Sequence, residues 1–191
     1  MVLARGKRRP IKMIHHIPEQ FKTGYRCILL LHRNKDGGEG NVQRRATKKI
    51  STCPEEWDQI VEEFSVIQEQ STTPYRIYAS INERDLNKAI HEFKRRQLAY
   101  DYGQTEADQK FYTNLNERFF SCIAAPGSRK ETQFLFDCDN QQEYEQALEG
   151  IPSDCILWDY ATKSGRHVIT KPFNPRPNTI SWRNDDLLFV K

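Results

Sequence analysis

A chain of 191 residues is long enough to bury one good hydrophobic core. Its mean hydropathy is low, at -0.80, but 10 Phe, 8 Tyr and 3 Trp supply large apolar side chains that a disordered chain lacks, so we expect a folded domain. No stretch approaches the roughly 18 to 20 apolar residues that cross a bilayer, and the basic start has no apolar segment behind it that would make a secretory signal. The five cysteines form no Cys-x-x-Cys pair, which disfavours a disulfide framework or a structural zinc site. These features predict a cytoplasmic protein with no membrane partner.

The net charge of +3 conceals an asymmetry along the chain. Residues 1–50 contain thirteen Lys and Arg against three acids, and therefore carry about +10, which leaves about -7 for the rest. A basic segment joined to an acidic one suits a protein that binds phosphate on one side and metal on the other. The alternative is a solubilising tail followed by a solvated hairpin.

The first 74 residues are predicted to form a basic N-terminal lobe. A strand is expected over 25–31, then a turn rich in Gly, Asn and Asp over 34–41, and a returning strand over 42–50. The returning strand carries four cations that could bind nucleic acid: Arg44, Arg45, Lys48 and Lys49. Pro54 and the two acids after it favour a helix start, and apolar residues then follow at helical spacing as far as about residue 71.

Residues 75–191 are predicted to form a second unit. Helices are expected over 83–100, 105–125 and 141–149, and strands over 75–81, 132–136, 155–159, 166–170 and 187–190. This order predicts an α+β fold with a small, largely antiparallel, palm-like (RRM-like) sheet and helices on one face, preceded by the basic β-hairpin and helix lobe.

Residues 134–139, FLFDCD, are the feature that most strongly suggests chemistry. Three apolar residues lead into two carboxylates, and strand alternation would place Asp137 and Asp139 on one face. Two carboxylates so close repel each other unless a cation neutralises them, and Mg²⁺ or Mn²⁺ prefers such oxygen ligands. The alternative is a structural strand end in which Asp139 caps the next helix.

Two later segments add to this candidate site. Residues 163–169, KSGRHVI, form a polar turn leading into a strand, and Lys163, Arg166 and His167 could contact triphosphate oxygens. Asp185 and Asp186 precede the apolar residues LLFV, so one of them could add a third carboxylate.

In this order the three segments resemble the motifs of the archaeo-eukaryotic primase superfamily, which includes primase-polymerases. That family has a strand ending in Asp-x-Asp, a Ser-x-His turn and a late Asp beside an apolar strand; here His167 lies three residues after Ser164, one more than usual. Residues 76–84, RIYASINER, also look like an Arg-aromatic-strand-Asn segment that precedes the first motif in several such proteins.

The resemblance implies metal-dependent nucleotidyl transfer, which adds nucleotides from NTP or dNTP to a nucleic-acid strand. It implies that two Mg²⁺ or Mn²⁺ ions bind Asp137, Asp139 and Asp186. It also implies contacts to the triphosphate from His167, supported by Ser164, Lys163, Arg166 and Arg76. The expected partners are nucleoside triphosphates, a DNA or RNA template and primer, and a replication protein such as a helicase.

Three alternatives compete with this interpretation. A haloacid-dehalogenase-type phosphatase also uses Asp-x-Asp, but its strand lies near the start of the domain, and a glycosyltransferase needs a larger nucleotide-sugar domain. The serious alternative is a non-catalytic module that binds single-stranded nucleic acid through the basic hairpin and through aromatic stacking.

Overall fold

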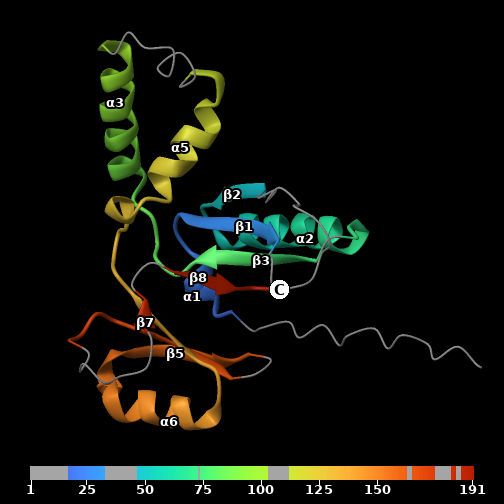
Figure 1. The fold of residues 1–191 in the computed structure, drawn as a ribbon, viewed down its shortest axis with the longest axis vertical. Coiled ribbons are helices and arrows are strands. Elements are labelled where there is room, and N and C mark those ends of the chain that lie inside the picture. The colour runs from blue at the N-terminus through green and yellow to red at the C-terminus, as the bar shows by residue number, and fades with distance from the viewer. Residues whose placement is uncertain are drawn as a thin grey trace, which may run out of the picture.

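The computed structural model describes residues 17–32, 47–72, 74–102, 112–162, 165–174, 182–183 and 186–191. These residues form two four-stranded antiparallel sheets with helices packed against them (Figure 1). The predicted α+β class is therefore confirmed. The strands do not, however, form the single sheet that was expected over residues 75–191.

The first sheet has the strand order β2-β1-β3-β8. Its strands are β1 (Arg26–His32), β2 (Thr47–Ser51), β3 (Tyr75–Ser80) and β8 (Leu187–Phe189). The short helix α1 (Glu19–Lys22) precedes β1 in the chain. The long helix α2 (Pro54–Gln70) covers one face of the sheet, where Trp57 and Phe64 pack with the β1 residues Ile28 and Leu30. As the sequence predicts, Pro54 opens α2, and the Glu56 carboxylate accepts a hydrogen bond from the Thr52 amide at 2.8 Å.

The proposed boundary between residues 74 and 75 falls inside this sheet. β3 pairs with β1 on one side and with β8 on the other, so strands from both proposed lobes share one sheet. The reason is visible in β3, where Ile77 to Ser80 are all buried. A strand buried in this way lies in the middle of a sheet and needs a partner on each side.

The second sheet has the strand order β5-β6-β4-β7. It contains β4 (Phe134–Cys138), β5 (Ile156–Ala161), β6 (Arg166–Thr170) and β7 (Trp182–Arg183). Helix α6 (Gln141–Gly150) covers one face through Ala147, which packs with Phe134, Phe136 and Val168. The alternate residues Leu135 and Ile169 belong instead to the core cluster of the first sheet. The two sheets thus share one core, with edge strand β8 lying towards the second sheet (Figure 1).

A pair of helices stands away from both sheets (Figure 1). Helices α3 (Leu86–Tyr102) and α5 (Leu115–Ile123) pack through Phe93 and Phe119, whose ring centres are 5.6 Å apart. Short 3-10 turns, η2 (Pro126–Ser128) and η3 (Ser153–Cys155), follow α5 and α6. Among the described helices, none has the length and apolar character that a membrane crossing requires.

Candidate functional site

The candidate site lies where β4 and β6 pair at one end of the second sheet. Asp137 and His167 stand directly opposite each other in the antiparallel register. Because side chains alternate along a strand, Asp137 shares a face with Leu135, and His167 shares a face with Ile169. Both side chains therefore lie on the face that packs against the first sheet. Two residues singled out from distant motifs are brought together here.

His167 links Asp137 to a third side chain. Its Nε2 lies 2.9 Å from Asp137 Oδ1, and its Nδ1 lies 2.5 Å from the hydroxyl of Tyr160. One tautomer satisfies all three groups: the Tyr160 hydroxyl donates to Nδ1, and the Nε2–H donates to Asp137. The imidazole is only 13% exposed, whereas the Asp137 side chain is 58% exposed. The buried imidazole thus orients a carboxylate that is open to solvent.

Tyr160 is held as a neutral hydroxyl at the base of this arrangement. Burial raises the pKa of Tyr160 well above its ordinary value, and the negative charge of Asp137 raises it further. The backbone of Phe189 in β8 also hydrogen-bonds to the phenol. The guanidinium of Arg76, a predicted phosphate-binding residue, lies 5.6 Å from the centre of the ring of the same Phe189.

Asp139 lies in a bend just after β4 and is exposed. The interpretation of Asp139 as a helix cap is not supported, because Asn140 performs that role: its side chain accepts a hydrogen bond from the Glu143 amide at 2.9 Å. The Glu143 carboxylate in turn accepts a hydrogen bond from the backbone amide of Asp139 at 2.8 Å, an arrangement similar to a capping box. This leaves the Asp139 carboxylate outside the capping interaction.

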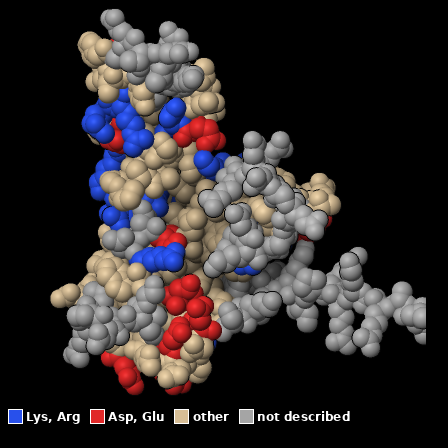
Figure 2. Space-filling model, viewed as in Figure 1, with Lys and Arg blue, Asp and Glu red and all other residues tan. Residues whose placement is uncertain are grey.

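Negative charge is concentrated at this strand end. The pKa of the Cys138 thiol is raised to about 11, first by burial and then by the charges of Glu143, Asp137 and Asp139. Acidic side chains are also seen together over the region of the second sheet and α6 (Figure 2). The resulting negative potential attracts cations to this end of the sheet.

Gly165 allows the turn before β6 to approach the candidate carboxylates closely. A β-carbon at this position would overlap the carbonyl oxygen of Cys138 and the carbonyl carbon of Asp139. Only glycine permits this approach without a shift of one backbone or the other. The backbone of Gly165 is therefore packed directly against the backbone of Cys138 and Asp139.

Arg166 lies on the opposite face from His167. Its Nε donates to Asp159 at 2.8 Å, and its guanidinium lies 4.8 Å from the centre of the Tyr144 ring on α6. Alternation along β6 explains this, because adjacent side chains point to opposite faces. The structure does not bring Arg166 to the predicted triphosphate site. Lys163 and Ser164 lie outside the described residues.

Asp186 is also separated from the other two acids. Its carboxylate accepts a hydrogen bond from Arg183 at 3.0 Å and from the Leu187 amide at 2.8 Å. Its carbonyl accepts from the Ile81 amide at 3.1 Å, next to Asn82, whose side chain accepts from the Gln133 amide. This places Asp186 at the Gln133 end of β4, and the four residues from there to Asp137 span about 13 Å of extended strand.

The three carboxylates consequently do not converge. Among the described residues, no group of three or more His, Cys, Asp and Glu side chains is placed to hold a metal ion. The physical reason is the chain path: β7 runs antiparallel to β4 and away from Asp137, and the chain then crosses to the first sheet as β8. Asp185, the alternative third acid, lies outside the described residues.

The predicted nucleic-acid-binding cations of the hairpin serve other contacts where they are described. Lys48 forms an ion pair with Glu117 of α5 at 2.8 Å, and Lys49 forms one with Glu63 of α2. Arg44 and Arg45 lie outside the described residues. The two described lysines thus join β2 to neighbouring helices.

Sequence reasoning missed Tyr160. A signal was present, because two strands joined by a short turn pair in antiparallel register, and Tyr160 pairs directly with His167. Counting outwards from the turn over 162–165 would have placed the two side chains opposite each other.

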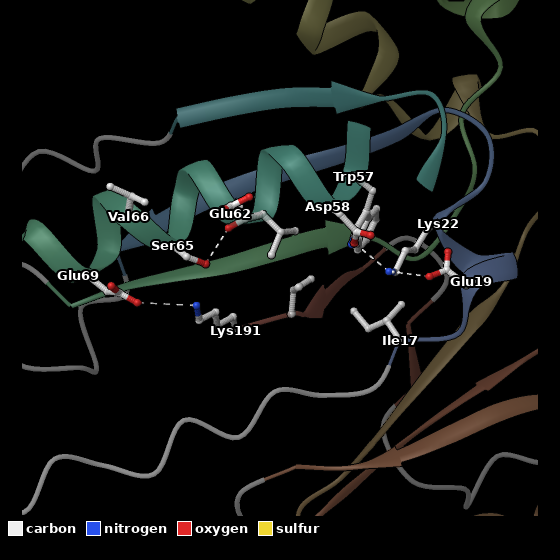
Figure 3. A pocket seen from close by; sticks show the side chains of 12 residues that line it. Ile17, Glu19, Lys22, Trp57, Asp58, Glu62, Ser65, Val66, Glu69 and Lys191 are labelled. Atoms are coloured by element: carbon white, nitrogen blue, oxygen red, sulfur yellow. Dashed lines mark hydrogen bonds and ion pairs between the residues drawn. The ribbon is translucent and has the colours of Figure 1, made fainter. Parts of the chain in front are cut away.

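A pocket of about 720 Å³ lies elsewhere, beside α2 and the last residues of the chain (Figure 3). Its charged rim is largely paired, with Lys22 2.8 Å from Asp58 and Lys191 4.0 Å from Glu69. None of the residues predicted to carry function lines it.

Comparison of the chain with protein-family models, with curated proteins and with solved structures finds no match. Function is therefore inferred from the geometry of the site and from the motifs.

Proposed function

We propose that this chain is a cytoplasmic, metal-dependent nucleotidyltransferase of the primase-polymerase type, acting at the end of β4. The observation that carries the proposal is the direct pairing of Asp137 with His167, which orients an exposed carboxylate two residues before a second one. The substrates would be nucleoside triphosphates and a DNA or RNA strand, and a replication protein such as a helicase would be a natural partner.

Asp137 and Asp139 would bind a Mg²⁺ or Mn²⁺ ion together with a nucleotide. Mg²⁺ commonly takes one or two protein carboxylates and completes its shell with water and substrate phosphates, so Asp137 and Asp139 suffice for one ion. Such an ion would neutralise phosphate charge and lower the pKa of the attacking hydroxyl. A role for Asp186 as a third ligand is not part of the proposal, because its carboxylate binds Arg183.

His167 acts through Asp137 in this account. Both ring nitrogens are engaged, so the imidazole holds the carboxylate in one orientation and keeps a proton at Nε2. Arg76, whose guanidinium lies on the ring of Phe189, would bind a phosphate oxygen in this account. Lys163 and Ser164 stay predictions for the same role.

The second candidate is a non-catalytic module that binds single-stranded nucleic acid. The observation that favours it is the separation of Asp186 from Asp137 and Asp139, which leaves two carboxylates where the resemblance implies three.

Calorimetric titration with Mn²⁺ in the presence and absence of a nucleoside triphosphate separates these candidates. The proposal predicts tight Mn²⁺ binding only when the triphosphate is present, and its loss by about a hundredfold in Asp137→Ala, because half of the protein ligands are removed. Asp154→Ala is the matched control, since Asp154 is an exposed acid in the turn before β5. Absence of triphosphate-dependent binding in the unmodified protein would leave only the binding module.

A further inference from the structure

One exposed stripe of α3 combines cations with apolar side chains. Residues three or four positions apart lie on one face of a helix. Lys88, His91, Arg95, Leu98 and Tyr102 follow this spacing, and all five are exposed. Leu98 is 56% exposed and Tyr102 is 85% exposed, an unusual position for large hydrophobic side chains.

The opposite face of α3 is occupied by α5, so the exposed stripe is a separate surface. Ala89 is buried against Ile123, and Phe93 packs on Phe119. At the base of the helix pair, Arg84 donates to the carbonyls of Ala124 and Ala125, each at 3.3 Å. We call α3 and α5 together the arm; its two helices are packed on each other and joined to the first sheet at this base.

The two helices of the arm contain more cations than acids: Lys88, Lys94, Arg95, Arg96 and Arg118 against Glu92, Asp101 and Glu117. Glu92 accepts hydrogen bonds from both Arg95 and Arg96, and these bonds lower the pKa of Glu92 to about 2. This acid therefore stays ionised and is shared by two guanidiniums, leaving a net positive charge on the trio. Lys94 is exposed beside them, and the Lys88 ammonium donates to the carbonyl of Arg129 at 2.8 Å and lies 4.0 Å from the Asp85 carboxylate.

The arm and an acidic part of the second sheet are visible from the same side of the molecule (Figure 2). Figure 2 shows Lys and Arg gathered over the region of α3 and η2, and Asp and Glu gathered over the second sheet. A polyanion would be attracted to the first region and repelled by the second unless a divalent cation were bound there. The exposed apolar end of the stripe adds a surface on which unpaired bases can stack.

We propose that the exposed stripe of α3, together with Lys94 beside it, binds single-stranded nucleic acid, with Lys88, Lys94 and Arg95 contacting phosphates and Tyr102 stacking on a base. The inference deepens the proposed function, because the bound strand would be the one on which the nucleotidyl transfer acts. Charge complementarity selects a polyanion, and the exposed aromatic residue selects one with accessible bases rather than a closed duplex.

Fluorescence anisotropy of a labelled oligothymidylate of about 12 nucleotides tests this, at several salt concentrations and with EDTA in place of metal and nucleotide. We expect the double variant Lys94→Gln/Arg95→Gln to bind the oligonucleotide at least about tenfold more weakly. The slope of log K against log salt concentration should become less steep by about 1.4, since each phosphate contact to a single strand contributes about 0.7 to that slope. Tyr102→Ala should weaken binding about fivefold or more, because a stacking contact is lost. It should leave the slope of log K against log salt concentration unchanged, because no phosphate contact is removed. Lys171→Gln, an exposed cation on the second sheet, is the control and should bind like the unmodified protein.

The proposal is overturned if the unmodified protein does not bind the oligonucleotide, or if the α3 variants bind it as the control does. Preferential binding to anionic phospholipid vesicles would also overturn it, since a membrane surface would then be the partner. Because the assay contains no metal or nucleotide, its failure would not affect the calorimetric result for Asp137, and failure of the calorimetry would not affect this one. Thermal melting of each variant confirms that the arm is folded.

Discussion

At the scale of single residues, the site depends on a chain of hydrogen bonds from Tyr160 through His167 to Asp137. Sequence patterns identified two of these three residues, since an acid after a buried strand and a His in a polar turn are both unusual. Sequence patterns could not assign the role of His167. A histidine can contact a triphosphate or orient a carboxylate, and the residue type is the same in both cases. That choice depends on which groups lie within hydrogen-bond distance, which only the folded structure determines.

Tyr160→Phe is predicted to weaken triphosphate-dependent Mn²⁺ binding by about tenfold, because residues that orient a metal ligand typically contribute 10- to 100-fold in affinity. The imidazole would lose the partner of Nδ1 and could rotate away from Asp137. Calorimetry provides the measurement. Tyr144→Phe removes a comparable hydroxyl, which donates to Asp159 at 3.1 Å near α6, and should retain the affinity. Equal affinity in the two variants would show that Tyr160 has no such role.

At the scale of elements, local patterns predicted well and distant pairings did not. The strand predicted over 132–136 is observed two residues later, as Phe134–Cys138, and the helix predicted over 141–149 is observed as Gln141–Gly150. The helix predicted over 83–100 is observed as Leu86–Tyr102. Strand β7 was not predicted, because a strand of two residues is too short to show the alternation of apolar and polar residues that identifies strands. The pairing of β8 with β3 joins segments more than a hundred residues apart, and no local signal specifies it.

Gly165→Ala should disrupt the packing of the turn before β6 against the end of β4. The added methyl group must displace the backbone of Cys138 and Asp139, and overpacking of this kind costs about 1 to 3 kcal/mol. We expect a lower midpoint in urea denaturation together with weaker triphosphate-dependent Mn²⁺ binding. Gly127→Ala, at a position with open space around it, is the control. Unchanged stability of Gly165→Ala would contradict the close approach of the two segments.

At the scale of the whole molecule, two sheets share one core, and the candidate carboxylates lie at the end of the second sheet on the face towards the first. Composition and charge predicted a folded domain with a basic segment over residues 1–50 and an acidic remainder. Most cations of that basic segment lie outside the described residues, and the Lys and Arg that Figure 2 shows gathered over α3 belong to the part that was predicted to be acidic. Composition could not show whether the chain divides at residue 74. The sequence of a strand indicates that it is buried, but it does not indicate which other strands pair with it. The position of Asp186 could not be predicted for the same reason, because it depends on the pairing of β8 with β3.

The most direct test of the central claim is the rate of Mn²⁺-dependent nucleotide incorporation on a primed template, compared among the unmodified protein, Asp137→Asn and Asp186→Asn. The account predicts a loss of about a hundredfold or more for Asp137→Asn, which corresponds to about 2.7 kcal/mol of transition-state stabilisation. It predicts a change within about threefold for Asp186→Asn, below about 0.7 kcal/mol. Incorporation by Asp137→Asn at the rate of the unmodified protein would contradict the account.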